Sequence, residues 1–188
     1  MSSIAWPHVL CRQGAALRHI REYCKDWQKD FAEIARYLGT YLPGECRIHH
    51  VGSTAIPNMP AKDVIDVDIE CPQGSMGRVV EGLSDAGYEH LGDRGIPTRE
   101  AFRPQEGSRA LLLHAHHLYA CESGSVELRR HLAFRDYLSS RPARARWLAA
   151  AKRRAADDAR TRQAYIEAKD AAYKAIVAEA TEWGVTRC

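Results

Sequence analysis

The segment DVIDVDIE, residues 63–70, constrains the fold of this chain more than any other part of the sequence. Half of its residues are β-branched and apolar, a composition that favours a pleated strand over a helix. The sequence Pro-Gln-Gly follows at residues 72–74 and provides a turn that ends the segment. We therefore predict a strand over residues 63–70.

Two acidic residues, Asp66 and Asp68, lie two positions apart in this strand. Side chains alternate along a strand, so both point to one face, with Cα atoms ~6.6–6.8 Å apart. Two carboxylates on an otherwise apolar strand are costly to bury unless their charge is compensated. A divalent cation compensates it directly, and Mg²⁺ (or Mn²⁺) prefers one or two carboxylates together with phosphate oxygens and water. The alternative is that Asp66 caps a neighbouring loop and Asp68 faces solvent.

The turn that precedes this strand favours the metal-binding interpretation. Residues 47–51 are a short candidate strand, and Gly52, Ser53 and Thr54 follow it. Glycine lets the backbone approach a ligand closely, and the N–H groups of the turn, with two hydroxyls, suit a phosphate chain. Nucleotidyl transfer needs a Gly-Ser turn followed by a D-x-D strand, because the turn holds the triphosphate and the carboxylates hold the metal ion.

The rest of the sequence alternates between helical and strand patterns. Residues 1–20 carry mixed signals, and we interpret them as an N-terminal extension to a single domain over residues 21–188. The order of elements indicates an α+β or α/β fold with a small mixed sheet. We expect helices over residues 26–38, 76–86, 123–138 and 142–183, the last interrupted near 157–158, and further strands over residues 101–103 and 110–121.

Composition argues against several classes of protein. No apolar run approaches the ~20 residues that cross a bilayer, and the first residues lack the pattern of a secretory signal. The six cysteines show no C-x-x-C spacing, so we expect reduced thiols in a cytoplasmic protein. A formal net charge of +3 is too small to indicate nucleic-acid binding by itself.

Two segments resemble a known family. Residues 49–69, HHVGSTAIPNMPAKDVIDVDI, resemble the signature block of the GrpB family, a branch of the nucleotidyltransferase superfamily. Residues 131–138, HLAFRDYL, are similar to a later segment of the same family. The resemblance covers residues 23–175 and includes, in the family's order, Asp26-Trp27 with Phe31, Gly87-Tyr88, Phe102-Arg103, His116-His117-Leu118, and Tyr165 with Lys169.

The resemblance implies an α+β, nucleotidyltransferase-like mixed sheet flanked by helices, with a helical C-terminal region. It places the Gly-Ser turn and the D-x-D strand at one edge of a cleft. Two positions depart from the family pattern. Tyr119 stands where members commonly carry the last histidine of His-His-Leu-His, and Asp68 is present where many members keep only the first aspartate. The second departure favours metal binding.

Active members of the wider superfamily often add a third carboxylate from a neighbouring strand, but residues 110–121 contain no acid. His117 is our first candidate for the missing ligand or for a base, and Glu100 and Glu122 lie nearby in sequence. Alternatively, the histidines of this strand hydrogen-bond within a packed sheet.

Basic residues supply candidates for phosphate contacts, since guanidinium and ammonium groups bind phosphate oxygens. The alternative for each is a solvated surface charge. We expect His131 and Asp136 to tie their helix to the sheet. The candidates are Lys62, Arg103, Arg109, Arg135 and Lys169, with Tyr165 one turn before Lys169 on the same helix face.

We therefore predict metal-dependent transfer of a nucleotidyl group from a nucleoside triphosphate to a small acceptor, with Asp66, Asp68 and His117 as the catalytic residues. The competing hypothesis is a binding protein for a nucleotide or another phosphorylated ligand, which the absent third acid and Tyr119 favour. A structural or interaction module is a third. Nucleic-acid binding by the arginine-rich residues 141–162 is disfavoured, because Trp147 is the only aromatic side chain among them.

Overall fold

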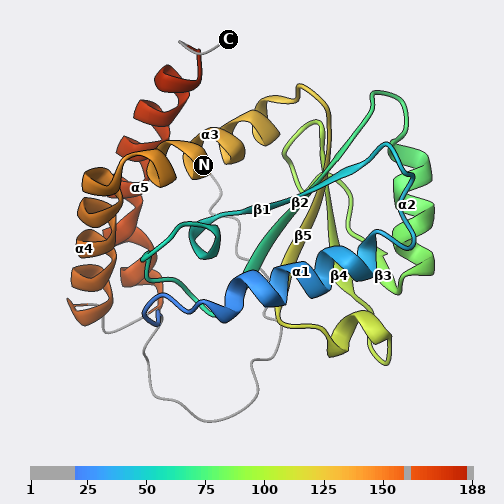
Figure 1. The fold of residues 1–188 in the computed structure, drawn as a ribbon, viewed down its shortest axis with the longest axis horizontal. Coiled ribbons are helices and arrows are strands. Elements are labelled where there is room, and N and C mark those ends of the chain that lie inside the picture. Colours follow the sequence, from blue (N-terminus) through green and yellow to red (C-terminus); the bar gives the residue numbers. More distant parts are fainter. Residues whose placement is uncertain (1–19, 159–161, 186–188) are drawn as a thin grey trace.

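The structure, a computed structural model, describes residues 20–158 and 162–185. Its centre is a five-stranded sheet in the order β1-β2-β5-β4-β3 (Figure 1). Only the central pair of strands, β2 and β5, is parallel, and the other neighbours are antiparallel. The sheet is therefore mixed. Its strands are β1 (Arg47–Val51), β2 (Ile65–Cys71), β3 (Tyr88–His90), β4 (Arg99–Pro104) and β5 (His116–Glu122).

One face of the sheet is apolar. Ile65, Val67 and Ile69 of β2 are fully buried there. They pack in one cluster with side chains of two helices, α1 (Asp26–Leu38) and α2 (Met76–Asp85). Full burial of an Ile or Leu side chain contributes about 1.5–3 kcal/mol, so this face supplies the main core. Figure 1 shows α1 crossing in front of the sheet and α2 at one end of it.

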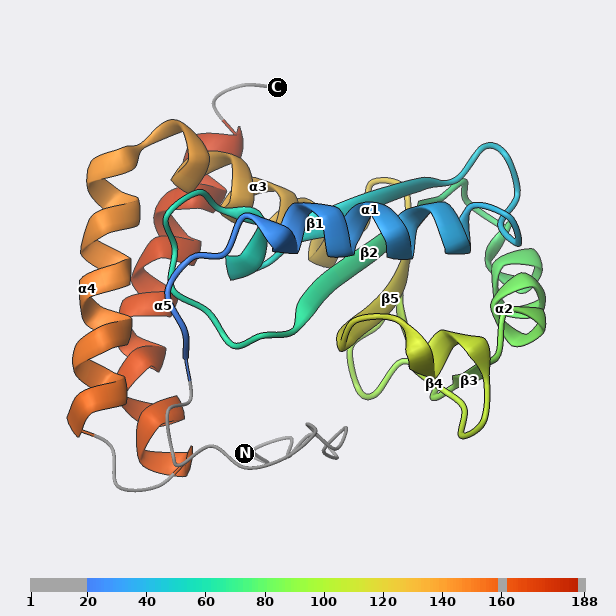
Figure 2. The same cartoon turned by 60° about the horizontal axis from the view of Figure 1, so that its bottom comes forward.

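The opposite face of β2 is acidic, because Asp66, Asp68 and Glu70 occupy the alternate positions of the same strand. The helix α3 (Val126–Ser140) contacts this face, since a side chain of α3 bonds to Asp68. Two long helices, α4 (Pro142–Asp158) and α5 (Arg162–Val185), lie side by side at the end of the molecule away from α2 (Figures 1 and 2).

A second apolar cluster joins the loop after β1 to these helices. Ile56 and Met59 of the loop are fully buried and pack against Phe134, Leu148 and Ile176. Those three side chains come from α3, α4 and α5 respectively. The loop that follows the Gly-Ser turn is therefore fixed between the sheet and the C-terminal helices.

The predicted α+β fold, with a mixed sheet and a helical C-terminal region, is confirmed. The expected strand over residues 63–70 is β2, displaced by one or two residues at its ends. The interruption expected near residues 157–158 borders residues 159–161, which lie outside the described residues, between α4, described to Asp158, and α5, described from Arg162. The N-terminal extension, residues 1–20, lies outside the described residues except for Ile20.

One predicted strand is wrong over its first half. Residues 109–112 form a short 3-10 helix, η2, and the strand begins only at His116. Leu111 and Leu112 are 44% and 81% exposed, so this apolar run does not mark a strand covered on both sides. The short strand β3 was not predicted.

In the part of the chain that the structure describes, no helix is both long and apolar enough to span a membrane.

Candidate functional site

The Gly-Ser turn lies directly against Asp66. Val51, the last residue of β1, is the register partner of Asp66 in β2, so the residue that follows β1 lies beside that carboxylate. Gly52 has φ of 69° and ψ of −166°, a conformation that is essentially restricted to glycine. A Cβ atom at Gly52 would lie 2.1 Å from Oδ2 of Asp66. The contact between this backbone and this carboxylate therefore requires glycine.

Lys152 of α4 also reaches the turn. Its Nζ donates a hydrogen bond of 2.8 Å to Oγ of Ser53, and its side chain is only 6% exposed. Lysine is seldom so buried in proteins. Lys152 was not predicted from the sequence, because it lies 99 residues after Ser53. A signal was present: Lys152 shares the buried face of its helix with Leu148 and Ala155.

His117 of β5 pairs with Asp66. The two residues are register partners in neighbouring strands, and Nδ1 of His117 lies 2.8 Å from Oδ1 of Asp66. Burial lowers the pKa of His117, but the hydrogen bond to Asp66 and its negative charge outweigh burial and raise the pKa overall. Lys62 lies close enough to oppose that rise. The structure thus brings His117 to the predicted carboxylate, with Lys62 close to His117.

Asp68 is fully buried and is held by His131 of α3. Nδ1 of His131 lies 2.7 Å from Oδ2 of Asp68, and its Nε2 lies 3.3 Å from Oε1 of Glu127. Burial lowers the pKa of His131, but the hydrogen bonds to these two carboxylates raise it to about 9. An imidazolium therefore compensates the buried acids. Glu127 was not predicted from the sequence, but His131 ties its helix to the sheet as expected.

The third acid on this face, Glu70, repeats the arrangement. Oε2 of Glu70 lies 2.9 Å from Nε2 of His49, and Oε1 accepts a hydrogen bond of 2.9 Å from Oγ of Ser123. All three carboxylates of β2 therefore contact a histidine, and the histidines come from β5, α3 and β1. This pairing lets an acidic strand lie within the fold, since an uncompensated buried charge is costly.

Other predicted residues are engaged elsewhere. The hydroxyl of Thr54 lies 3.0 Å from Nε2 of His50, within the protein. Arg103 lies in β4, two strands from β2, and is paired with Glu89 at 2.6 Å. The side chains of Tyr165 and Lys169 lie outside the described residues, although their backbone is part of α5. The side chains of Thr54 and Arg103 are therefore bonded to His50 and to Glu89.

The two suggested third acids lie on the wrong face of the sheet. Glu100 is the register partner of Ala120 and contacts His90 at 2.6 Å. Glu122 is the partner of Cys71 and accepts a hydrogen bond from the backbone of Gly74. By strand register, both residues therefore belong to the face of the sheet opposite Asp66 and Asp68. The positions beside Asp66 and Asp68 in β5 carry His117 and Tyr119 instead.

The expectation that Asp136 ties its helix to the sheet was wrong. Asp136 contacts its own neighbour Arg135 at 2.7 Å rather than the sheet. Arg135 makes the link instead, because its guanidinium donates a hydrogen bond of 3.2 Å to the carbonyl oxygen of His50. Arg135 therefore stabilises the contact between α3 and β1.

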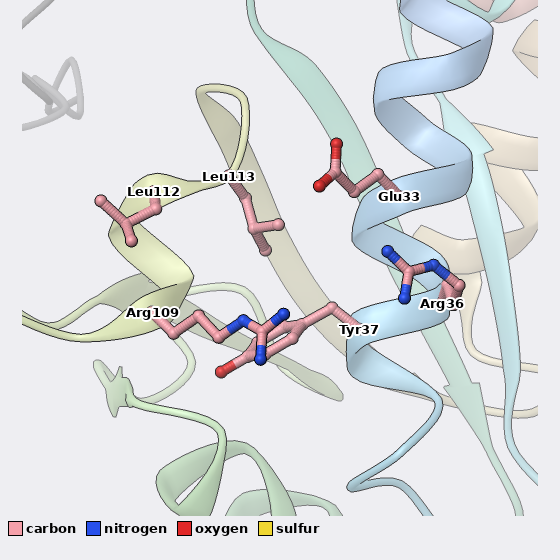
Figure 3. A pocket seen from close by; sticks show the side chains of 6 residues that line it. All are labelled: Glu33, Arg36, Tyr37, Arg109, Leu112 and Leu113. Atoms are coloured by element: carbon pink, nitrogen blue, oxygen red, sulfur yellow. The ribbon is translucent and has the colours of Figure 1, made fainter.

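Arg109, another phosphate candidate, lines a separate pocket of about 100 Å³ between α1 and η2 (Figure 3). Its guanidinium lies over the ring of Tyr37, 5.7 Å from the ring centroid. Because α1 covers the apolar face of the sheet, this pocket lies on the other side from Asp66. Its lining residues are Glu33, Arg36, Tyr37, Arg109, Leu112 and Leu113.

The carboxylates of β2 fit a divalent cation that arrives with phosphate ligands. Oδ1 of Asp68 is buried and has no hydrogen-bond partner among the described residues. It is therefore an unsatisfied acceptor that a bound cation would stabilise. No three His, Cys, Asp or Glu side chains within residues 20–158 and 162–185 form a ready-made metal site. Mg²⁺ does not require one, since it takes one or two carboxylates with phosphate oxygens and water.

A mixed sheet with a Gly-Ser turn set against a D-x-D strand is a nucleotidyltransferase-like arrangement. The chain belongs to the GrpB family, since the family model for GrpB protein matches residues 18–179. The resemblance seen in the sequence is therefore confirmed. Among solved structures, the conserved protein GrpB from Enterococcus faecalis is similar, with a TM-score of 0.72 and 30% sequence identity over 87% of this chain and 97% of that chain.

Relatives of known sequence carry names that state no activity. The UPF0157 protein YqkA of Bacillus subtilis is 34% identical over 164 residues, which are 86% of this chain and 46% of that protein. The UPF0157 protein PA4798 of Pseudomonas aeruginosa is 34% identical over 151 residues, 77% of this chain and 60% of that protein. The chain thus matches less than two thirds of the length of either relative.

Proposed function

We propose that this protein binds a nucleoside triphosphate on the acidic face of its sheet and transfers the nucleotidyl group to a small acceptor. The observation that carries the proposal is the meeting of three elements at one point. The backbone of Gly52 touches Asp66, and the adjacent Ser53 is bonded to the buried Lys152. A backbone turn, a hydroxyl and an ammonium group beside a carboxylate suit a phosphate chain and its cation.

Residues of the turn would hold the outer phosphates. Ser53 offers a hydroxyl and Lys152 offers a positive charge at the same place, 2.8 Å apart. Because Gly52 has no side chain, the carboxylate of Asp66 can lie directly against the turn that would hold the phosphates. Lys152 would therefore supply the positive charge for which the sequence suggested Arg103 and Lys169. Lys62 lies close to His117.

Asp66 and Asp68 would hold Mg²⁺ or Mn²⁺, which when bound polarises the α-phosphate and stabilises the charge of the departing pyrophosphate. His117, which contacts Asp66, would accept the proton of the acceptor hydroxyl. In the reaction the acceptor oxygen bonds to the α-phosphorus, the bond to the bridging oxygen breaks, and pyrophosphate leaves.

A second candidate is a binding protein of the same fold that does not turn its ligand over. The observation that favours it is the pair His117 and Tyr119, which occupy the positions of β5 beside Asp66 and Asp68. Neither side chain is a carboxylate, so the site has two acids on its central strands where active relatives in the wider superfamily often have three.

Calorimetric titration with ATP, CTP, GTP and UTP, each with and without Mg²⁺, tests the proposal. We expect at least one nucleotide to bind in a Mg²⁺-dependent manner. Asp66→Asn should weaken that binding tenfold or more, which corresponds to about 1.4 kcal/mol. The matched control is Glu100→Gln, which removes one carboxylate charge on the other face of the sheet and should leave the affinity unchanged.

Release of pyrophosphate with a panel of hydroxyl-bearing acceptors then separates an enzyme from a binding protein. Release that requires His117 supports transfer, and tight binding without release supports the second candidate. Nucleotide binding that is equal in the wild type and in Asp66→Asn would place the ligand elsewhere and refute both.

A further inference from the structure

The two carboxylates of the site are held in different ways. Asp66 contacts His117, whose side chain is 45% exposed. Asp68 is buried and contacts His131, whose second ring nitrogen reaches Glu127. Glu127 lies one helical turn before His131 on α3, and Arg130 also bonds to Glu127. Asp68 is therefore connected through His131 to Glu127, and both of these residues belong to α3.

This chain occupies only one oxygen of Asp68. Its Oδ2 accepts the hydrogen bond from Nδ1 of His131 at 2.7 Å. Its Oδ1 is buried and has no hydrogen-bond partner among the described residues. A carboxylate that rotates freely can offer either oxygen to a cation. A carboxylate held by a hydrogen bond to one oxygen offers only the other oxygen, and in a single direction.

We propose that His131 is a positioning residue that fixes Asp68 so that Oδ1 alone is presented to the cation, and that Glu127 fixes His131 in turn. The inference rests on the proposed function, since it assigns the support of that same site. It predicts that Asp68 binds the cation through one oxygen, and that loss of the His131 contact weakens cation binding even where the fold is intact.

The two ring nitrogens of His131 allow a matched pair of variants. In His131→Asn the amide nitrogen can replace Nδ1, so the contact with Asp68 is kept and the contact with Glu127 is lost. In His131→Gln the amide nitrogen can replace Nε2, so the contact with Glu127 is kept and the contact with Asp68 is lost. Both changes remove the imidazole and its charge, which makes each variant the control for the other.

The affinity for the Mn²⁺–tripolyphosphate complex, followed by water-proton relaxation, tests the inference without knowledge of the base or the acceptor. Loss of a hydrogen bond that orients a metal ligand typically costs about 10–100-fold in metal affinity. We expect a loss of this size in His131→Gln and a loss of less than about threefold in His131→Asn. Binding of tripolyphosphate in metal-free buffer should be equal in the two variants, because it does not involve Asp68.

A purely structural contribution of His131 gives a different pattern. In that case the two variants lose affinity in parallel with their loss of thermal stability, and the inference is overturned. Affinity that stays at the wild-type value in His131→Gln overturns it as well. If the wild type itself fails to bind the Mn²⁺ complex, both the proposed function and this inference are overturned. This result is distinguished from failure of the inference alone, because it is seen in the wild type before any variant is made.

Discussion

Gly52 is the residue on which the geometry of the turn depends most. Its φ of 69° and ψ of −166° belong to a region that other residues almost never occupy. The absence of a side chain also lets Asp66 lie against the backbone, since a Cβ atom would collide with its carboxylate. Gly52 thus determines both the backbone conformation of the turn and the position of Asp66 against it.

Gly52→Ala should therefore lower stability and disturb the site together. Backbone strain of this kind costs about 1–3 kcal/mol, and the collision with Asp66 adds to it. The control is Gly107→Ala, whose φ is 77° but whose added Cβ would meet nothing within 4 Å. Urea unfolding and nucleotide titration should show lost stability in both variants and lost binding only in Gly52→Ala. Equal binding in the two variants would contradict the account.

The protonation of His131 should be visible in the pH dependence of stability. Its pKa is raised from 6.5 to about 9 in the folded protein, since the hydrogen bonds to Asp68 and Glu127 outweigh burial. A raised pKa contributes stability that is fully present below about pH 6.5 and is lost as the pH rises through about 9, and its size is on the order of 3 kcal/mol.

Urea unfolding in metal-free buffer from pH 6 to pH 10 measures this contribution as the difference between the wild type and His131→Asn. Groups common to both proteins cancel in the difference. We expect the wild type to lose its advantage progressively between about pH 6.5 and pH 9. A difference that stays constant across this range would show that His131 is not charged at neutral pH.

At the scale of elements, α4 contributes to the site through one side chain. Lys152 lies on the buried face of α4, and Arg154 lies on its exposed face. We expect Lys152→Met to weaken binding of tripolyphosphate in metal-free buffer by about tenfold or more, because a hydrogen bond to a charged group contributes about 1.5–3 kcal/mol.

Arg154→Met is the matched control, since it removes one positive charge from the same helix and should change the affinity less than about twofold. Isothermal titration at two salt concentrations separates a local contact from the general field of the protein, because only the field is screened at long range. Comparable losses in the two variants would remove Lys152 from the site.

The elements predicted correctly are those with strong local signals. The strand β2 follows from its β-branched residues, and α1 follows from the helical spacing of Trp27, Ile34 and Leu38, all buried in the structure. The apolar run at residues 110–113 misled the prediction, since only Ala110 of the first three is buried. Hydrophobicity alone does not distinguish a buried strand from a short helix that exposes leucines.

At the scale of the whole molecule, the sheet separates an apolar core from an acidic face. The apolar core is formed with α1 and α2, and the acidic face is closed by α3 and reached by α4. Ile56 and Met59 connect the turn to the C-terminal helices. The sheet therefore carries Asp66 and Asp68, while the helices supply Lys152, His131 and Glu127.

This division explains which site residues could be predicted from the sequence. Gly52, Asp66 and Asp68 lie within one short segment, and strand alternation already places the two acids on one face. Lys152 and Glu127 reach the same face from helices whose packing angles no local pattern specifies. The partners of Arg103 and Thr54, which are Glu89 and His50, could not be predicted for the related reason that tertiary contacts set them.

The most direct test of the central claim is a crystal structure of the protein with Mn²⁺ and a non-hydrolysable nucleoside triphosphate. We predict anomalous density for Mn²⁺ between Asp66 and Oδ1 of Asp68, with phosphate oxygens in contact with Ser53 and Lys152. The account is contradicted if the triphosphate binds away from the Gly52 turn. It is equally contradicted if Mn²⁺ is bound elsewhere while the contacts of Asp66 with His117 and of Asp68 with His131 stay unchanged.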